Sequence, residues 1–235
     1  MDKSFTIIHP SRSRAGLAHD TAIKWLQSAS KEFMGSNIEY IISVDIDDPQ
    51  LPVYKSLFDG KQFKLIKARN NNVVQAMNSG ARFAINDILV CISDDIEPCD
   101  NWDKLLCEAI DKDELAIQVN DGITNNVNSS YYKKFGHHEL IMVCPVMTLK
   151  LYQKLGYVYY PEYTGMFADN DLAECCAILG VLKYCPDIQF THRHFTNGMA
   201  QMDATYARHN NRQSWLLGEK IIERRRETKF GFDNQ

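Results

Sequence analysis

Residues 88–95 read ILVCISDD, a wholly apolar run that ends in serine and two adjacent aspartates. A short apolar run bounded by polar residues is typical of a buried strand. Two carboxylates at the mouth of such a strand repel each other unless a cation or hydrogen-bond donors lie nearby. Mg²⁺ and Mn²⁺ take oxygen ligands and commonly share them with substrate phosphates. The pair is therefore either part of a metal site or an acidic loop that caps the next helix, and alone it does not decide between the two.

Strand patterns alternate with helix patterns on both sides of this run. The predicted strands cover residues 5–8, stopped by Pro10, then 38–44, 63–66 and 88–92. The predicted helices cover residues 18–34 (including Phe33), 73–86 and about 102–109. Such alternation favours an α/β fold with a parallel, doubly wound sheet. Ligands of these sheets bind outside the carboxyl ends of the strands, where Asp45 and Asp94 directly follow two of them.

The second half of the chain is less regular. We predict a loop over residues 121–128, which are rich in Asn and Gly, and a strand over the apolar residues 140–149. A helix over about 170–179 should end at Gly180, because glycine commonly terminates helices. Further strands are expected over 181–184 and 188–192. His137 and His138 lie in a polar stretch and are expected to be exposed.

The length and charge limit the classes of protein. A chain of 235 residues can bury one sizeable core, and with no repeat or linker we expect a single domain. The formal net charge of −4 argues against a nucleic-acid partner. The basic run at residues 224–226 is either a solvated helix end or a patch for an anionic lipid, glycan or phosphate.

The cysteines and the N-terminus favour a cytoplasmic protein. Seven cysteines, an odd number without framework spacing, are typical of reduced thiols. The N-terminus leads straight into a strand pattern and has no signal-peptide character. No apolar stretch is long enough to predict a transmembrane segment.

A helix of small residues precedes the apolar strand, and a tryptophan follows the aspartates. The spacing is Ala76-x-Asn78-x-Gly80-x-x-x-Ala84, then residues 88–92, then Asp94-Asp95, then Trp102. This arrangement resembles the nucleotide-sugar-binding half of the family 2 glycosyltransferases, which have the GT-A fold. Upstream, residues 7–12 (IIHPSR) look like the first strand of that family and its proline-containing loop.

The resemblance continues downstream. Residues 168–172 (ADNDL), followed by Gly180, Pro186 and His192, are similar to the family's Glu-Asp-x-Asp-Leu segment, glycine, proline and closing histidine. The match touches about 5–103 and 165–195. It implies one GT-A domain over residues 1–235. Its parts would be a nucleotide-sugar-binding half (about 1–103), an acceptor-binding half (about 104–200) and a C-terminal helical extension (201–235).

The resemblance also implies a set of donor contacts. Asp45 matches the acidic residue that contacts the nucleoside base or ribose, and Asp94 would lie near the ribose or diphosphate. The other implied contacts are Pro10, Ser11, Arg12, Asn72 and Asn78. Arginine suits a phosphate because its planar fork makes two hydrogen bonds, although Arg12 would equally suit the surface. Asn72 suits a donor-side contact or a loop cap equally well.

For the metal, the resemblance implies Asp95, because Ser93 occupies the first position of the family's Asp-x-Asp motif. His192 has the family spacing from Pro186, and His194 lies two residues further along an extended segment, so both point the same way. Neutral imidazole is a common metal ligand, and the alternative is an ordinary hydrogen-bonding histidine. The expected cofactor is Mn²⁺ or Mg²⁺.

Asp169 is the expected general base, with Ala168 in place of the family's usual glutamate. The alternative is that Asp169 caps the helix that begins near residue 170. A base in this position would take the proton of an acceptor hydroxyl as that hydroxyl attacks the sugar.

The predicted function is therefore a glycosyltransferase that moves a sugar from a UDP- or GDP-sugar to a glycan or other hydroxyl acceptor, with inversion. A nucleotidylyltransferase is one alternative, but its glycine-rich basic loop fits residues 9–16 (HPSRSRAG) poorly. The other alternative is a non-catalytic module that binds a nucleotide or glycan, which the loss of the first motif carboxylate at Ser93 would suit.

Overall fold

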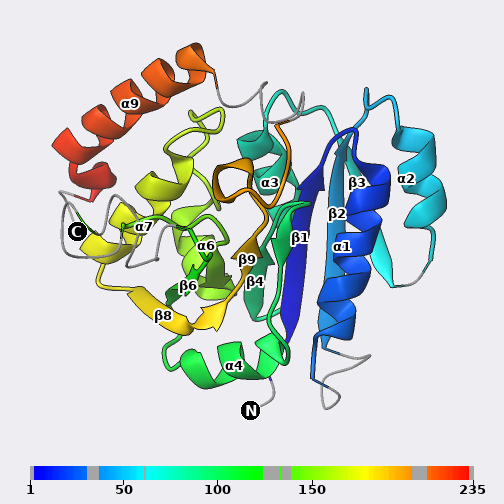
Figure 1. Cartoon of the computed structure of the whole chain (residues 1–235). Coiled ribbons are helices and arrows are strands. Elements are labelled where there is room, and N and C mark those ends of the chain that lie inside the picture. The colour runs from blue at the N-terminus through cyan, green and yellow to red at the C-terminus, as the bar shows by residue number, and fades with distance from the viewer. Residues whose placement is uncertain are drawn as a thin grey trace.

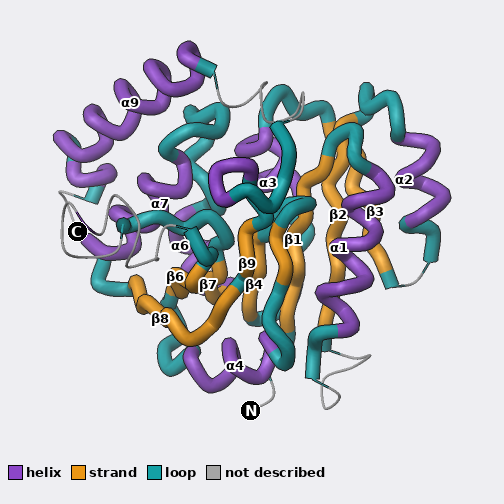
Figure 2. Tube along the Cα trace, in the orientation of Figure 1, coloured by secondary structure: helices purple, strands orange, loops and turns teal. Residues whose placement is uncertain are grey.

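The computed structural model describes residues 3–30, 37–60, 62–123, 133, 139–202 and 211–232. In these ranges a seven-stranded sheet runs through the molecule with helices on both faces, beside a two-stranded ladder (Figures 1 and 2). The sheet has the order β3-β2-β1-β4-β7-β6-β8. All its neighbouring pairs are parallel except those of β7, which is antiparallel to both β4 and β6.

The strands of the large sheet are β1 (Phe5–Ser11), β2 (Ile38–Asp45), β3 (Phe63–Ala68), β4 (Ile88–Cys91), β6 (Ala116–Asn120), β7 (Val146–Thr148) and β8 (Leu182–Gln189). The ladder consists of β5 (Ile96–Glu97) and β9 (Thr191–His192). The α-helices are α1 (Ala15–Gln27), α2 (Leu51–Leu57), α3 (Val73–Ala81), α4 (Trp102–Ala109), α6 (Leu149–Leu155), α7 (Ala168–Ile178) and α9 (Arg212–Glu227). Short 3₁₀ helices cover Phe195–Asn197 and Lys229–Gly231.

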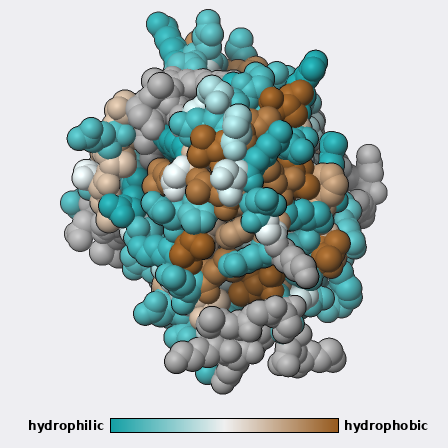
Figure 3. All heavy atoms as spheres, turned by 90° about the vertical axis from the view of Figure 1, so that its right-hand side faces the viewer, coloured by the Kyte–Doolittle hydropathy of each residue, from teal (hydrophilic) through white to brown (hydrophobic). Residues whose placement is uncertain are grey.

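Two hydrophobic cores lie on the two faces of the sheet, because successive side chains of a strand point to opposite faces. Phe5 and Ile7 of β1 pack with α1 and α4, whereas Ile8 packs with α3, α6 and α7. Figure 3 shows the side of the molecule at the right of Figure 1, where apolar groups are scattered among hydrophilic ones. The buried apolar side chains of the two cores lie between the sheet and its helices.

The small residues of α3 allow this helix to lie close to the sheet. A Cβ on Gly80 would lie 2.9 Å from Ile8 Cγ2 and 3.3 Å from Ser43 Cβ. Ser43 on β2 also donates a hydrogen bond to the carbonyl oxygen of Ala76 (2.9 Å). The small-residue spacing read from the sequence thus has a direct packing reason.

Two elements in the first half have boundaries that differ from the prediction. Strand β1 runs through Pro10 to Ser11 and does not stop before the proline. Beyond Ile8, β1 is paired with β2 and no longer with β4, and a strand with one open side tolerates the missing N–H of proline. Helix α1 begins at Ala15 and ends at Gln27, not at 18 and 34, and Phe33 lies outside the described residues.

The next predicted helix is also shorter than expected. Helix α3 ends at Ala81 rather than 86, since the N–H groups of Phe83 and Ala84 bond to carbonyls three residues back and tighten the chain out of the helix. Strands β2, β3 and β4 and helix α4 are close to prediction, and helix α2 was not predicted.

The second half departs further. The predicted strand over 140–149 is only β7, and Leu149 already begins α6. Helix α7 starts at Ala168 with Phe167 as its N-cap, so the alternative that Asp169 caps this helix is wrong. Residues 124–128 of the predicted loop, as well as His137 and His138, lie outside the described residues.

All seven cysteines are free thiols. Among the described helices, none has both the length and the apolar character needed to cross a bilayer.

Candidate functional site

A buried chain of hydrogen bonds from Tyr40 through His9 orients the carboxylate of Asp94. His9, on β1, is fully buried, and its Nε2 lies 2.9 Å from Asp94 Oδ1. Its Nδ1 lies 2.7 Å from the hydroxyl of Tyr40 on β2. Burial, with the nearby charge of Asp94, raises the pKa of Tyr40, so the phenol keeps its proton. We therefore assign Tyr40 as donor to His9 Nδ1, and His9 Nε2–H as donor to Asp94.

Further contacts of Asp94 come from α1 and from the residue before it. Arg14 Nη1 lies 3.8 Å from Asp94 Oδ2, and Thr21 donates a hydrogen bond to the Asp94 carbonyl oxygen (2.6 Å). Main chain and side chain of Asp94 are thus both fixed by neighbouring elements, although the residue stands in a loop after β4.

Asp95 faces different partners. Ser93 donates a hydrogen bond to Asp95 Oδ1 (2.5 Å), and His192 Nε2 lies 3.4 Å from Asp95 Oδ2. The ladder explains this meeting, since Ile96 of β5 pairs with His192 of β9, and the N–H of Arg193 donates to the Asp95 carbonyl oxygen (2.8 Å). Main-chain pairing therefore brings the predicted metal ligands Asp95 and His192 together.

His194 lies beside this pair. Its ring centroid is 4.8 Å from that of His192. Partial burial, with the neighbouring His192, lowers the pKa of His194, which favours the neutral imidazole that metals bind.

Within the part of the chain that the structure describes, no three His, Cys, Asp or Glu side chains converge as a complete metal site. Asp95 and His192 supply one carboxylate and one imidazole. Mg²⁺ and Mn²⁺ commonly complete such partial sites with substrate phosphates and water. The donor set therefore fits a cation that is shared with a bound phosphate.

A cavity of about 330 Å³ opens beside the two aspartates, within the size range of small-ligand pockets. It lies between the start of α1 and residues 199–201. Its charged lining is Arg14, Asp94, Asp95, Glu97 and Arg193. Asp45 and Asp169 are not among its lining residues, so the cavity covers only the end of the site at the aspartate pair.

The end of β2 carries a second polar cluster. Arg12 donates to Asp45 and, at 2.7 Å, to the exposed Asp47. Asn70 donates to the other oxygen of Asp45 (2.9 Å). Asp45 is buried and Arg12 is partly exposed, so the predicted donor residues Arg12 and Asp45 do lie together.

Ser11 and Pro10 belong to the sheet. The Ser11 hydroxyl lies 2.6 Å from that of Tyr54 on α2, and Pro10 is buried within β1.

The two asparagines of the small-residue helix use their amides inside the protein. Asn72 is the N-cap of α3 and accepts a hydrogen bond from the N–H of Gln75 (2.9 Å). Asn78 donates to the carbonyl oxygen of Tyr159 (2.7 Å) and accepts from the N–H groups of Val158 and Tyr159. Of the two roles open to Asn72, the structure shows the cap. A donor contact of either asparagine stays a prediction.

Asp169 lies in the first turn of α7. Solvent still reaches the residue, but protein atoms surround its carboxyl group densely, and this burial raises its pKa to about 6. The N–H of Asn170 donates to the carboxylate (3.0 Å) and opposes the shift, while the charges of Glu139 and Asp121 add to it. A carboxylate with a pKa close to neutrality suits proton transfer.

Asp121 is a residue that sequence reasoning missed. It directly follows β6, is buried, and its carbonyl oxygen accepts the N–H of His192 (3.0 Å). The signal was the same as at Asp94, an acidic residue after a strand. However, Gln118 and Asn120 interrupt the apolar pattern of β6, so the strand was not predicted.

Glu139 was missed as well. It accepts a hydrogen bond from Asn170 Nδ2 (3.2 Å), next to Asp169 in the chain. Burial raises the pKa of Glu139, and the charge of Asp121 adds to that shift.

A family model described as "Glycosyl transferase family 2" matches residues 20–170. The chain belongs to glycosyl transferase family 2. The family assignment confirms the resemblance inferred from the sequence and the enzyme class that it implied. No curated protein sequence matches the chain.

Solved structures of glycosyltransferases have the same fold. The mannosyltransferase PcManGT from Pyrobaculum calidifontis, in complex with GDP-Man and Mn²⁺, has a TM-score of 0.69 at 13% identity. That alignment covers 95% of this chain and 65% of PcManGT. S. aureus TarS 1-349 has a TM-score of 0.61 at 12% identity, over 80% of this chain and 59% of TarS 1-349. The same fragment in complex with UDP-GlcNAc has a TM-score of 0.63 at 12% identity. That alignment covers 97% of this chain and 73% of the fragment.

These similarities confirm the GT-A fold of the family 2 chain. The chain spans about 59% of TarS 1-349 and 65% of PcManGT. The predicted division into donor-binding and acceptor-binding halves stays a prediction.

Proposed function

We propose that this family 2 chain transfers a sugar from a nucleotide-diphosphate donor to an acceptor hydroxyl, with the help of a divalent cation. The observation that carries the proposal is that the side chains of the two adjacent aspartates after β4 contact different partners. Asp94 is tied to His9, whereas Asp95 faces His192 across the β5–β9 ladder. His9 thus orients the Asp94 carboxylate, and the Asp95 carboxylate, beside His192, is the one that would share a cation with a phosphate.

The donor would bind along the carboxyl edge of β1, β2 and β4. Asp45 and Arg12 would contact the nucleoside, and Asp94 the ribose or diphosphate. Arg14 lines the cavity near Asp94, and its guanidinium would bind the diphosphate. A UDP- or GDP-sugar is the proposed donor, in keeping with the GDP-Man and UDP-GlcNAc complexes of PcManGT and TarS.

Asp95 and His192 would hold Mn²⁺ or Mg²⁺, with His194 beside them. When bound there, a divalent cation would supply positive charge that stabilises the diphosphate leaving group. Ser93 holds Asp95 in place through its hydrogen bond to Oδ1, which leaves Oδ2 facing His192.

Asp169 would accept the proton of the acceptor hydroxyl. The hydroxyl oxygen forms a bond to the anomeric carbon, the bond to the diphosphate breaks, and the proton goes to the Asp169 carboxylate. A single displacement of this kind inverts the anomeric configuration. The raised pKa of Asp169, about 6, supports this role.

The acceptor is proposed as a glycan or another hydroxyl compound, and the location as the cytoplasm. The seven free thiols are in keeping with a reducing compartment.

Release of nucleoside diphosphate from UDP-GlcNAc and from GDP-mannose tests the proposal, with Mn²⁺ and with a chelator in its place. We expect slow Mn²⁺-dependent release from at least one of the two. Replacement of Asp95 by Ala should lower that release about 100-fold or more, because such charge stabilisation contributes several kcal/mol. Replacement of the exposed Asp100 by Ala should leave it unchanged, as a control for removing a nearby carboxylate.

Three outcomes would contradict the proposal. Release of pyrophosphate from a nucleoside triphosphate and a sugar phosphate would show a nucleotidylyltransferase. Binding of a nucleotide sugar without turnover would show a non-catalytic module. If neither nucleotide sugar raises the melting temperature in the presence of Mn²⁺, the donor site itself is wrong.

A further inference from the structure

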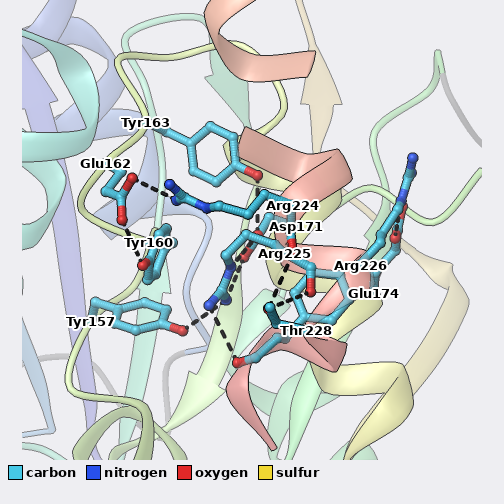
Figure 4. A network of polar contacts seen from close by, with 11 residues as sticks. Tyr157, Tyr160, Glu162, Tyr163, Asp171, Glu174, Arg224, Arg225, Arg226 and Thr228 are labelled. Atoms are coloured by element: carbon cyan, nitrogen blue, oxygen red, sulfur yellow. Dashed lines mark hydrogen bonds and ion pairs between the residues drawn. The ribbon is translucent and has the colours of Figure 1, made fainter. Parts of the chain in front are cut away.

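The basic run at residues 224–226 binds partners within the protein. Arg224 pairs with Glu162 (2.6 Å), and Arg226 makes two hydrogen bonds to Glu174 (2.7 and 2.5 Å) (Figure 4). Arg225 pairs with Asp171 (2.8 Å). Each arginine of the run thus has a carboxylate partner of its own chain. The run therefore attaches helix α9 to the segment that carries α7. The carboxylates of the chain, rather than an external anion, pair with its three charges.

Arg225 is the buried centre of this attachment. Its guanidinium makes two hydrogen bonds to Asp171 (2.8 and 3.1 Å) and one to the hydroxyl of Tyr157 (3.1 Å). It also lies 3.8 Å above the ring of Tyr160. Tyr163 donates a further hydrogen bond to Asp171 (3.1 Å), as Figure 4 shows. Asp171 lies in the first turn of α7, two residues after Asp169.

The N-terminal half of α9 contacts the backbone just before α7. A Cβ on Gly218 would lie 2.5 Å from the carbonyl oxygen of Met166 and 2.8 Å from the ring of Phe167. The ring of Phe167 meets that of Trp215 edge-on, with centroids 5.0 Å apart. The glycine is therefore required for this close approach of helix and backbone, because any side chain at 218 would push Met166 away.

Phe167 has a left-handed backbone conformation, with φ of +69°. Such a conformation is unfavourable for a residue with a Cβ and persists where its surroundings hold it. Phe167 is the N-cap of α7, and its carbonyl oxygen accepts the N–H of Asp171 (2.9 Å). The direction in which the first turn of α7 leaves Phe167 therefore sets where the carboxylate of Asp169 points.

We infer that helix α9 positions the general base: Trp215 and Gly218 hold Phe167 in its left-handed conformation, and Arg225 fixes Asp171 on the other side of Asp169. The inference rests on the proposed role of Asp169. It assigns the C-terminal extension to catalysis of sugar transfer, although Trp215, Gly218 and Arg225 are positioning residues and touch no substrate in this scheme.

The test compares four variants in the Mn²⁺-dependent release of nucleoside diphosphate from whichever of UDP-GlcNAc and GDP-mannose the wild type cleaves. Replacement of Gly218 by Ala should lower kcat about tenfold and leave the KM for the donor within about twofold, since small misplacements of a reacting group are costly. Replacement of Trp215 by Ala should give a smaller loss of kcat with the same KM. Trp215 is 50% exposed, so this variant tests the inference even if the glycine variant does not fold.

Gly16→Ala is the matched control. It is the same substitution in helix α1, where a Cβ would meet nothing within 4 Å, and it should leave kcat unchanged. The Asp169→Asn variant separates the two proposals. If Asp169→Asn does not lower kcat, the proposed base is wrong. If it does, but Gly218→Ala and Trp215→Ala both keep the wild-type kcat, or raise KM in step with a fall in melting temperature, the positioning role of α9 is wrong and the base stands.

Discussion

Asp94 and Asp95 are neighbours in the chain, but their carboxylates have different surroundings. Asp94 receives a hydrogen bond from a fully buried histidine, whereas Asp95 faces His192 at 3.4 Å. Buried polar groups are expensive to leave without partners, so the chain from Tyr40 through His9 specifies one orientation of the Asp94 carboxylate. The two adjacent aspartates thus differ in their surroundings, because the partner of Asp94 is on β1 and the partner of Asp95 is on β9.

Replacement of His9 by Leu should test that chain. The variant leaves the Asp94 carboxylate and the Tyr40 hydroxyl without their buried partner, which should lower the free energy of unfolding by about 1–3 kcal/mol. It should also weaken the binding of UDP or GDP. Urea denaturation and nucleotide titration measure the two effects. His19→Gln, on the partly buried face of α1, is the control, and an unchanged urea midpoint for His9→Leu would contradict the assignment.

Asp169 predicts a pH dependence of turnover and of stability. Burial raises its pKa from an ordinary 3.8 to about 6 in the folded chain. A base must be ionised, so donor turnover should fall as the pH drops through about 6. Between about pH 4 and 6 the folded state binds more protons than the unfolded state. The destabilisation caused by the buried charge is therefore fully present above pH 6 and disappears as the pH falls toward 4.

The Asp169→Asn variant should accordingly be more stable than the wild type at pH 8, by on the order of 2 kcal/mol, with little difference near pH 4. Metal-free urea denaturation at the two pH values measures this without any substrate. Asp187→Asn, at an exposed position on β8, should change stability equally little at both. An equal gain for Asp169→Asn at pH 4 and pH 8 would mean that its pKa is not raised.

Helix α3 illustrates how an element depends on one close approach. Alanine is favoured over glycine within helices by about 1 kcal/mol, so a Gly→Ala change should stabilise a helix wherever there is room. At Gly80 there is none, because the added Cβ would lie 2.9 Å from Ile8 in the buried strand β1. The packing against the sheet should therefore outweigh the helix propensity.

We expect Gly80→Ala to lower the free energy of unfolding by about 1–3 kcal/mol, the usual cost of overpacking. Gly16→Ala in α1, which has open space around it, should be neutral or slightly stabilising. Thermal and urea denaturation of both variants give the comparison. Two changes of the same sign and size would show that α3 is not closely packed on β1.

At the scale of the molecule, both halves of the chain contribute to the hydrophobic core on the α1 face of the sheet. Trp25 of α1 packs against Trp102 (5.2 Å between ring centroids) and against Phe190 (4.8 Å), which follows β8. The Trp25 indole also donates a hydrogen bond to the carbonyl oxygen of Ile96 (2.9 Å). An aromatic residue from the late part of the chain thus completes the core of the early part.

Unfolding in urea should therefore be a single transition, although the sequence suggested two functional halves. Tryptophan fluorescence and far-ultraviolet circular dichroism should give the same midpoint. Trp215→Phe removes the one half-exposed tryptophan of the three, so that fluorescence reports only Trp25 and Trp102. A fluorescence midpoint that precedes the loss of helix signal would show that the halves unfold separately.

The parts of the fold that were predictable from sequence are those with a local cause. Strand β4 is wholly apolar and α3 carries its small residues in a regular spacing, so both were placed and Asp94 and Asp95 with them. Asp45 and Asp169 were proposed as site residues from their place after a strand and in a family motif. The hydrogen-bond partners of Asp45 and the burial of Asp169 could not be predicted, because distant segments supply them.

The parts that were missed depend on contacts between distant segments. Asp121 was missed because its strand includes Gln118 and Asn120, whose polar side chains hide the pattern. The left-handed Phe167 was not predicted, because a phenylalanine gives no local sign of that conformation and its cause lies about fifty residues away, in α9. His192 was predicted as a ligand from family spacing, but only the ladder explains how it reaches Asp95.

The β5–β9 ladder also has a consequence for the timing of assembly. It pairs Ile96 with His192, 96 residues later in the chain. A growing polypeptide therefore completes Asp94, Asp95 and the strands beneath them well before it contains the partner histidine. Contacts between such distant residues tend to form late in folding, after the local helices and hairpins. The Asp95–His192 pair therefore cannot form in a partly synthesised chain, which contains both aspartates long before it contains the histidine.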